Sequence, residues 1–342
     1  SETRRGRFEE AADMTAMPNL HDVYSARARI RQMIRRTPLI SSPKLARESG
    51  AGALWCKLES LQNTGAFKVR GASNKILGLS DEEKGRGVIT FSTGNHGKAV
   101  SYVAGRTGIR AVVCLSEHVP AYRVEKIREL GAEVEVKGHS QDEAEEHYNS
   151  LVAERGMIPV VPFDDPAVVA GQGTISLEIF EEQPEIDVLL VPLSGGGLLA
   201  GMAMAAKSIH PGIRVVGVSI ERSPAMLESI RAGRPVPVEE KDTLADSLLG
   251  GIGKENRYTL RMVKEYVDEH VTVTEEEIER AMVYAFAEHS LVIEGAASVG
   301  LAALMGGKVE VTGKKVATVF SGGSIDTSLY LSVLERHIES RR

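Results

Sequence analysis

The pattern of hydrophobic and polar positions repeats one rhythm from about residue 86 onward. A short run of β-branched residues is followed by a loop of small residues and then by a stretch with apolar positions at helical spacing. Strands that alternate with helices in this way are typical of a parallel sheet covered by helices. The predicted strands are 87–91, 109–115, 134–136, 187–192, 214–219, 271–273 and 316–320, and the predicted helices are 98–104, 121–130, 141–155, 167–182, 198–209, 275–288 and 296–304.

The rhythm falls into two blocks, so the predicted fold class is α/β with two parallel-sheet domains. Residues 66–160 form the smaller domain, and residues 161–342 form the larger one together with an early segment, residues 19–65. No linker rich in Pro, Gly and Ser separates the blocks, so we expect close packing with a cleft between them. In open parallel sheets ligands bind beyond the carboxyl ends of the strands. Residues 1–18 show no periodicity and are expected to form a mobile tail or an arm on a neighbouring subunit.

Composition and charge exclude several classes of protein. The formal net charge of -6 argues against a nucleic-acid partner, because such proteins concentrate Lys and Arg on one surface. No apolar run reaches the roughly 18 residues that cross a bilayer, so no membrane partner is expected. Cys56 and Cys114 lie inside apolar runs, which predicts reduced thiols in the core. Together with the polar N-terminal residues, these features predict a cytoplasmic protein.

Lys68 stands in the segment SLQNTGAFKVRGAS, residues 60–73, where a loop of small residues turns into a helix. A lysine at the start of a helix is usually no more than a solvated charge. Here apolar Phe67 and Val69 flank it, and apolar surroundings destabilise the ammonium form of lysine. The free amine that results is the form needed for imine chemistry.

Three further loops each come directly after a predicted strand. The first, FSTGNHGK at residues 91–98, offers N–H groups and the hydroxyls of Ser92 and Thr93, which predicts a site for a carboxylate. An ordinary helix N-cap is the simpler interpretation of that segment alone. The second, VPLSGGGLLAG at 191–201, has consecutive glycines whose N–H groups can converge on phosphate oxygens. This second loop matches neither the Walker pattern nor the dinucleotide-binding pattern, which disfavours a nucleotide ligand.

The third loop, FSGGSID at 320–326, by itself predicts only a tight turn.

Taken together these motifs resemble the threonine and serine dehydratases and the related serine racemases over about residues 22–338. The matching segments are TGAFKVRGA, STGNHGKAV, VPFDDPAVVAGQGTISLEI, PLSGGGLLAG, IEGAASVG and SGGSID. The resemblance implies pyridoxal 5'-phosphate (PLP) as cofactor and the tryptophan synthase β-like fold, PLP fold type II, with the cofactor in the cleft between two domains. STGNHG and LADSLLGGIGKENR are most similar to the branch of hydroxyectoine-utilisation dehydratases.

The resemblance also implies a role for each matched position. Lys68 would hold PLP as a Schiff base and act as the catalytic base, with Phe67 packed beside it. Asn95 would bond the ring hydroxyl, Ser321 would face the pyridine nitrogen, and Glu294 would line the pocket near the ring. The loop for the phosphate would consist of Ser194, Gly195, Gly196, Gly197 and Leu198. The residues that would receive the substrate carboxylate, largely through backbone N–H groups, are Ser92, Thr93, Asn95 and His96.

Two departures from the family pattern refine these expectations. Relatives that bind a divalent cation have carboxylates where this chain has Ser219 and Ala225, so no metal is expected, although Glu221 lies near. Serine racemases have a serine where this chain has Thr93. Its hydroxyl, expected on the face opposite Lys68, makes Thr93 the second candidate catalytic residue and leaves racemisation open.

The implied function is an ammonia-lyase that eliminates water from a β-hydroxy amino acid such as L-threonine or L-serine and yields a 2-oxo acid and ammonia. A dehydratase of hydroxyectoine catabolism and an amino-acid racemase are the alternatives within the family. β-Replacement is disfavoured, because cysteine synthases have Asn-Thr-Gly where this chain has Asn95, His96 and Gly97. A nucleotide-binding or catalytically silent protein is the rival from another class. The expected partners are a small amino-acid substrate and further copies of the chain, in a homodimer or homotetramer.

Overall fold

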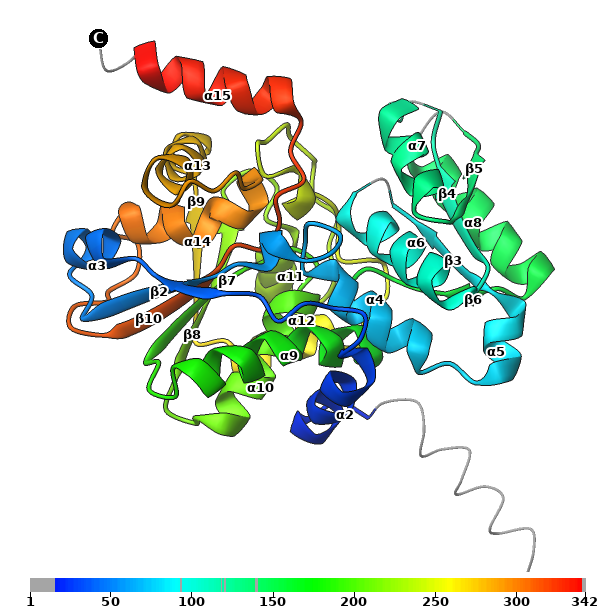
Figure 1. Ribbon diagram of the computed structural model, residues 1–342, viewed down its shortest axis with the longest axis horizontal. Coiled ribbons are helices and arrows are strands. Elements are labelled where there is room, and N and C mark those ends of the chain that lie inside the picture. Colours follow the sequence, from blue (N-terminus) through cyan, green and yellow to red (C-terminus); the bar gives the residue numbers. More distant parts are fainter. Residues whose placement is uncertain (1–15, 93, 118, 120, 139–140, 340–342) are drawn as a thin grey trace, which may run out of the picture.

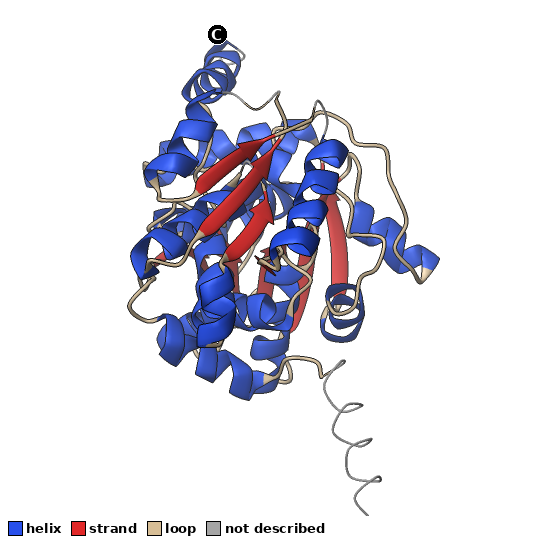
Figure 2. Ribbon diagram, turned by 90° about the vertical axis from the view of Figure 1, so that its right-hand side faces the viewer, coloured by secondary structure: helices blue, strands red, loops and turns tan. Residues whose placement is uncertain are grey.

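The computed structural model describes residues 16–92, 94–117, 119, 121–138 and 141–339 (Figure 1). The chain forms two β-sheets that lie side by side, each with helices on both faces (Figures 1 and 2). The predicted N-terminal tail falls mostly on residues 1–15, outside the described residues. None of the described helices is both long and apolar enough to cross a membrane.

The larger sheet has six strands in the order β1-β2-β10-β7-β8-β9. Its strands are β1 (Leu39–Ser41), β2 (Ala53–Lys57), β7 (Val188–Pro192), β8 (Arg214–Ile220), β9 (Glu269–Val273) and β10 (Lys315–Val319). β1 pairs with β2 in the antiparallel sense, and the other neighbours pair in parallel. The early strand β2 therefore lies beside the late strand β10.

The helices around the larger sheet, with two short 3-10 helices, come from both ends of the chain. They are α2 (Leu20–Ile30), α3 (Pro43–Ser49), η1 (Glu59–Leu61), α9 (Pro166–Glu182), α10 (Gly197–Ile209), α11 (Ala225–Ala232), η2 (Asp246–Leu248), α12 (Thr259–Tyr266), α13 (Glu275–His289), α14 (Gly295–Met305) and α15 (Thr327–Glu339). They divide into two sets, because successive side chains of a strand point to opposite faces. In β7, Val188 and Leu190 belong to the core with α13 and α14, whereas Leu189 and Val191 belong to the core with α9 and α10. Both faces are covered, which explains why β7 is apolar throughout.

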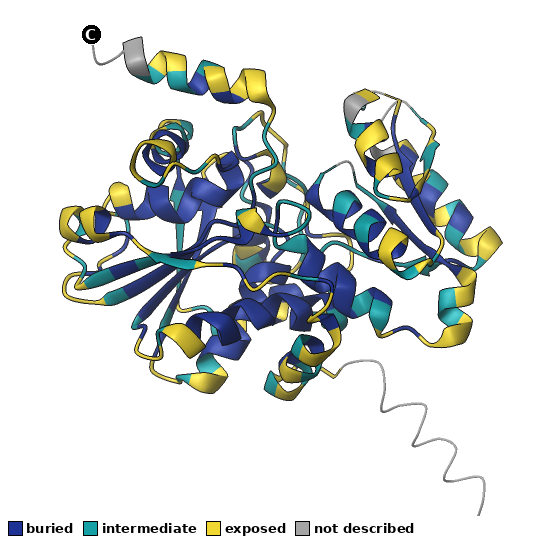
Figure 3. Ribbon diagram, viewed as in Figure 1, coloured by how far each residue is buried: buried dark blue, intermediate teal, exposed yellow. Residues whose placement is uncertain are grey.

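The smaller sheet has four parallel strands in the order β5-β4-β3-β6. Its strands are β3 (Val88–Phe91), β4 (Ala111–Leu115), β5 (Glu133–Val136) and β6 (Ile158–Pro159), and its helices are α4 (Lys68–Leu77), α5 (Asp81–Arg86), α6 (Asn95–Thr107), α7 (Ala121–Glu129) and α8 (Gln141–Arg155). Val113 packs with α4, α6 and α7 on one face, and Val112 packs with α8 on the other. Figure 3 shows the buried strands of both sheets beneath helices whose outer faces are exposed.

Helix α4 is joined closely to α9, which belongs to the larger sheet. A Cβ on Gly71 would lie 2.4 Å from Gln172 Nε2, and a Cβ on Gly171 would lie 2.7 Å from the Cα of Gly71. Both distances are too short for a real contact, so only glycine permits this approach of the two helices. The start of α4, where Lys68 lies, is therefore fixed against the larger sheet.

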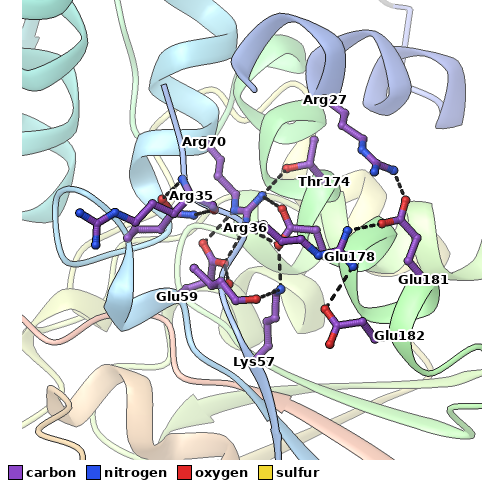
Figure 4. A network of polar contacts seen from close by, with 12 residues as sticks. Arg27, Arg35, Arg36, Lys57, Glu59, Arg70, Thr174, Glu178, Glu181 and Glu182 are labelled. Atoms are coloured by element: carbon purple, nitrogen blue, oxygen red, sulfur yellow. Dashed lines mark hydrogen bonds and ion pairs between the residues drawn. The ribbon is translucent and has the colours of Figure 1, made fainter. Parts of the chain in front are cut away.

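Four buried charged side chains fix the same junction (Figure 4). Arg70 of α4 makes two hydrogen bonds of 2.8 Å to Glu59 and bonds of 2.7 and 2.9 Å to Glu178 of α9. Lys57 at the end of β2 donates to Glu178 at 2.7 Å and to the carbonyl of Thr37 at 2.6 Å. Two cations and two carboxylates balance one another, which offsets the cost of removing them from water. We call Lys57, Glu59, Arg70 and Glu178 the buried tetrad.

Candidate active site

Lys68 is the first residue of α4, and its side chain is half-buried. Its Nζ donates a hydrogen bond of 2.7 Å to the carbonyl oxygen of Pro162 and lies 5.2 Å from the centre of the Phe67 ring. Burial lowers the pKa of the Lys68 ammonium to about 8, against a smaller opposing effect of the Glu294 carboxylate. The neutral, nucleophilic amine is therefore far more populated near neutral pH than it is in a solvated lysine, although the ammonium form remains the major one.

The glycine loop at residues 194–198 lies against the residue that follows Pro162. A Cβ on Gly195 would lie 2.3 Å from the ring of Phe163, and a Cβ on Gly197 would lie 2.9 Å from the Cα of Phe163. Gly196 has φ +89°, in the left-handed region that favours glycine. The amine of Lys68 and the glycine loop are thus brought together through residues 162 and 163, far from both in sequence.

The start of α10 has the properties of a phosphate site. Gly196 is its N-cap and provides no side-chain cap, so the first N–H groups of the helix are not satisfied by a capping side chain. Unpaired N–H groups and the helix dipole attract an anion. This start of α10 therefore fits a phosphate group.

Glu294 and Asn95 join the two sheets at the same place. Asn95 begins α6, and its Nδ2 donates to both oxygens of Glu294 at 2.9 and 3.1 Å. The backbone N–H of Ser324 donates to the same carboxylate at 3.0 Å. Burial raises the pKa of Glu294 to about 7, although these hydrogen bonds lower it. Asn95 Oδ1 is buried with no hydrogen-bond partner among the described residues, which leaves an acceptor for a hydroxyl group of a ligand.

Ser321 lies two residues beyond the end of β10 and is buried. Its carbonyl oxygen accepts a hydrogen bond of 3.0 Å from the N–H of Phe67, and Ala66 forms an isolated bridge with Gly322. The backbone before Lys68 is therefore tied to the loop after β10. Phe67 itself is half-buried, and the centre of its ring lies 5.2 Å from Lys68 Nζ.

The loop predicted to receive a carboxylate is described only in part. Ser92 is half-buried, and its Oγ accepts from the N–H of Gly94 at 3.4 Å. Thr93 lies outside the described residues, so its predicted role stays a prediction. His96 is buried with its Nε2 2.8 Å from the carbonyl oxygen of Val160. Since a carbonyl can only accept, Nε2 carries the hydrogen, and burial together with the Lys68 charge lowers the pKa of His96 to about 3. The ring is neutral and anchored toward β6.

Sequence reasoning missed several residues of this site. Pro162 and Phe163 fall in the motif VPFDDP, which the resemblance includes, but no pattern assigned them a contact. Lys98, one turn after Asn95 in α6, is predicted from the pattern as an ordinary helix residue, yet its Nζ donates to Ser324 Oγ at 3.1 Å. Lys98 follows Asn95 by three residues, and this helical spacing could have indicated that both side chains lie on the same face of α6. The sequence does not indicate the buried tetrad, because its four charged residues are far apart in the chain and charged residues are normally exposed to solvent.

The residues present fit a phosphorylated aromatic aldehyde. The uncapped glycine loop suits its phosphate, the unpaired Asn95 Oδ1 suits a ring hydroxyl, and the Lys68 amine suits the aldehyde carbon. A family described as pyridoxal-phosphate dependent enzymes matches residues 30–322. The chain belongs to this family, and its cofactor is PLP.

Individual relatives are similar over nearly the whole chain. A putative threonine dehydratase of Sinorhizobium fredii is 46% identical over 316 residues, which cover 92% of this chain and 95% of that protein. The L-threonine ammonia-lyase of Thermotoga maritima is 42% identical over 320 residues, 94% of this chain and 79% of that protein. The structure of maize serine racemase, 32% identical, superposes with a TM-score of 0.87 over 95% of this chain and 99% of that one. The two-sheet architecture is that of the PLP enzymes of fold type II.

Proposed function

We propose that this chain is a PLP-dependent ammonia-lyase that eliminates water from a β-hydroxy amino acid such as L-threonine or L-serine, with a 2-oxo acid and ammonia as products. The observation that carries the proposal is the half-buried amine of Lys68, hydrogen-bonded to Pro162 beside the glycine loop. An amine with a lowered pKa can bind an aldehyde covalently and can also accept a proton.

Bound PLP acts as an electron sink that makes the Cα–H of a linked amino acid acidic. The chain's own residues determine which bonds then break. Lys68 takes the Cα proton, and its carbonyl partner Pro162 orients the amine. The N–H groups of residues 194–198 hold the phosphate. The loop of Ser92, Asn95 and His96 binds the substrate carboxylate, and Thr93 would complete it.

Two further polar side chains, Ser321 and Glu294, have different roles beside the cofactor. Ser321 would present a neutral hydroxyl to the pyridine nitrogen, which would disfavour a lasting charge there and so disfavour transamination. Glu294 holds Asn95 in place through two hydrogen bonds. The leaving hydroxide departs from Cβ with a proton as water, and the resulting enamine is hydrolysed to the 2-oxo acid and ammonia.

The substrate class is supported by the relatives rather than by geometry alone. Two of them are named for dehydration or deamination of threonine. A racemase is the second candidate, because the maize serine racemase has the same fold. Racemisation needs a proton donor on the face opposite Lys68, and Thr93 is the residue proposed there.

The test is to incubate the PLP-loaded protein with L-threonine, L-serine and amino acids derived from hydroxyectoine. We expect 2-oxo acid and ammonia in equal amounts, and we expect Lys68→Ala to reduce turnover by at least 1,000-fold while the fold is retained. Chiral analysis of the remaining substrate measures racemisation in the same samples. A Lys68→Ala protein with near wild-type elimination would overturn the proposal.

We also propose the broader organisation expected from the sequence. The chain would form two domains, one of residues 19–65 with 161–342 and one of residues 66–160, and the two separate sheets support this division.

A homodimer or homotetramer is supported by exposed apolar side chains such as Phe286 and Leu331. A cytoplasmic location is supported by Cys56 and Cys114, both free and buried. Light scattering of the purified protein measures the oligomeric state.

A further inference from the structure

A hollow of about 190 Å³ opens directly beside Asn95. Its lining residues include three cations from α6 and α7: Lys98, Arg123 and Lys126. Two carboxylates, Asp246 and Asp326, also line it. The hollow therefore adjoins the loop at residues 92–96, where the substrate carboxylate is expected to bind.

Lys98 is the cation closest in sequence to the reacting groups. It lies one helical turn after Asn95, and a residue three positions along a helix lies on the same face. The side chain is half-buried, and its Nζ donates to Ser324 Oγ at 3.1 Å. Among the described residues it makes no ion pair. Burial lowers its pKa, Glu294 raises it, and Arg123 and Lys126 lower it further.

The acidic residues nearby do not neutralise Lys98 by direct contact. Glu294 already accepts from Asn95 and from the N–H of Ser324. Asp326 accepts from the N–H of Leu329 at 3.0 Å and from Ser328 Oγ at the start of α15. Asp246 is the remaining acidic group that lines the hollow. A half-buried ammonium with only a hydroxyl partner gains from a ligand that brings a carboxylate.

We propose that Lys98 determines substrate specificity by binding a second, distal carboxylate, so that the preferred substrate is a β-hydroxy amino dicarboxylate such as 3-hydroxyaspartate. This inference rests on the proposed function and narrows its substrate class. L-Threonine and L-serine have only a methyl group or hydrogen at that position and leave Lys98 without an anionic partner.

The reaction balances without an oxidant or a second substrate. The Cα–H and Cβ–O bonds break, the Cα proton passes to Lys68, and an equivalent proton joins the leaving hydroxide, so that one water departs and Lys68 returns to its starting protonation state. Hydrolysis of the resulting enamine then consumes one water and breaks the C–N bond. The products of 3-hydroxyaspartate are oxaloacetate and ammonia.

The test compares kcat/KM for each diastereomer of 3-hydroxyaspartate with kcat/KM for L-serine, both measured as ammonia release by the PLP-loaded enzyme. We expect the better diastereomer to exceed L-serine by at least tenfold in the wild type. In Lys98→Gln, which removes the charge and keeps the polarity, that ratio should fall by at least tenfold.

Lys126→Gln is the matched control, because Lys126 also lines the hollow but is exposed and paired with Glu129 at 3.2 Å. Its ratio should stay within about threefold of the wild type. A wild type without preference for the dicarboxylate, or a Lys98→Gln ratio like that of the wild type, overturns the inference. If the Lys98→Gln protein does not retain PLP, the test rests on the wild type: a kcat/KM for 3-hydroxyaspartate that does not exceed that for L-serine overturns the inference. Failure of the proposed ammonia-lyase function gives a different result from failure of this inference, because no β-hydroxy amino acid would then release ammonia.

Discussion

At the scale of single residues, the site depends on ionisable groups whose pKa values are moved toward neutrality. The pKa of Lys68 is lowered to about 8 and that of Glu294 is raised to about 7, in both cases mainly by burial. Groups with such values exchange protons readily near pH 7. The pKa of His96, lowered to about 3, excludes this ring from the same chemistry.

Glu294→Gln tests, in the cofactor-free chain, whether the buried charge of Glu294 destabilises the fold. The pKa of Glu294 is raised in the folded state, so the wild type loses stability as pH rises from its ordinary pKa near 4.5 to about 7. Glutamine has no charge to bury, and its amide can donate to the unpaired Asn95 Oδ1. We expect the thermal midpoint of the variant to exceed that of the wild type at pH 8, with a smaller difference at pH 5.

The measurement is a thermal melt of both proteins at several pH values from 5 to 8. A difference that is constant over this range would show that Glu294 does not ionise within it. A variant that is less stable at pH 8 would mean that the hydrogen bonds of the carboxylate outweigh the cost of burying its charge.

At the scale of secondary-structure elements, the strands that the hydrophobic pattern predicts agree closely with those found. The pattern predicts a strand over residues 187–192, and Val188–Pro192 form β7, because an apolar run bounded by small residues has few other structures available. The predicted start of α6, at residue 98, is three residues too late. Its first turn holds Asn95 and His96, buried polar residues that break the apolar pattern.

The site could be predicted from the sequence only where a motif indicated it. Glycines and Lys68 stand out because their chemistry is unusual at such positions. The contact of Pro162 with Lys68 and that of Glu178 with Arg70 join segments about 100 residues apart, and no local pattern encodes them. The short helices α11 and α12 were not predicted, since eight residues give too little periodicity.

Arg70→Met tests whether the buried tetrad holds α4 against α9. The substitution leaves Glu59 and Glu178 with Lys57 alone, so one buried negative charge is uncompensated. We expect the free energy of unfolding, from urea denaturation, to fall by about 3–5 kcal/mol.

Arg110→Met is the matched control, because Arg110 makes the same kind of double hydrogen bond to Glu133, at 2.9 and 2.8 Å, on the exposed surface. Its loss should cost less than about 1 kcal/mol. Equal losses in the two variants would contradict a special role for the tetrad in stability.

At the scale of the whole molecule, the site is assembled from both sheets. Lys68 and Asn95 begin helices of the smaller sheet, whereas Glu294, Ser321 and the loop at 194–198 belong to the larger one. Such a site is complete only when the two parts are packed together. The carboxyl ends of the parallel strands β3, β7 and β10 each precede one of its loops, in agreement with the general rule for open parallel sheets.

The central claim is that Lys68 holds PLP at this meeting of the two sheets. The most direct measurement is reduction of the PLP-loaded protein with sodium borohydride, which makes a covalent link between PLP and an amine permanent, followed by mass spectrometry of its peptides. We expect one modified lysine, Lys68. Modification of a different lysine would contradict the claim; Lys98, whose Nζ donates to Ser324 Oγ at 3.1 Å, is the nearby alternative. An active enzyme with no modified lysine would also contradict it.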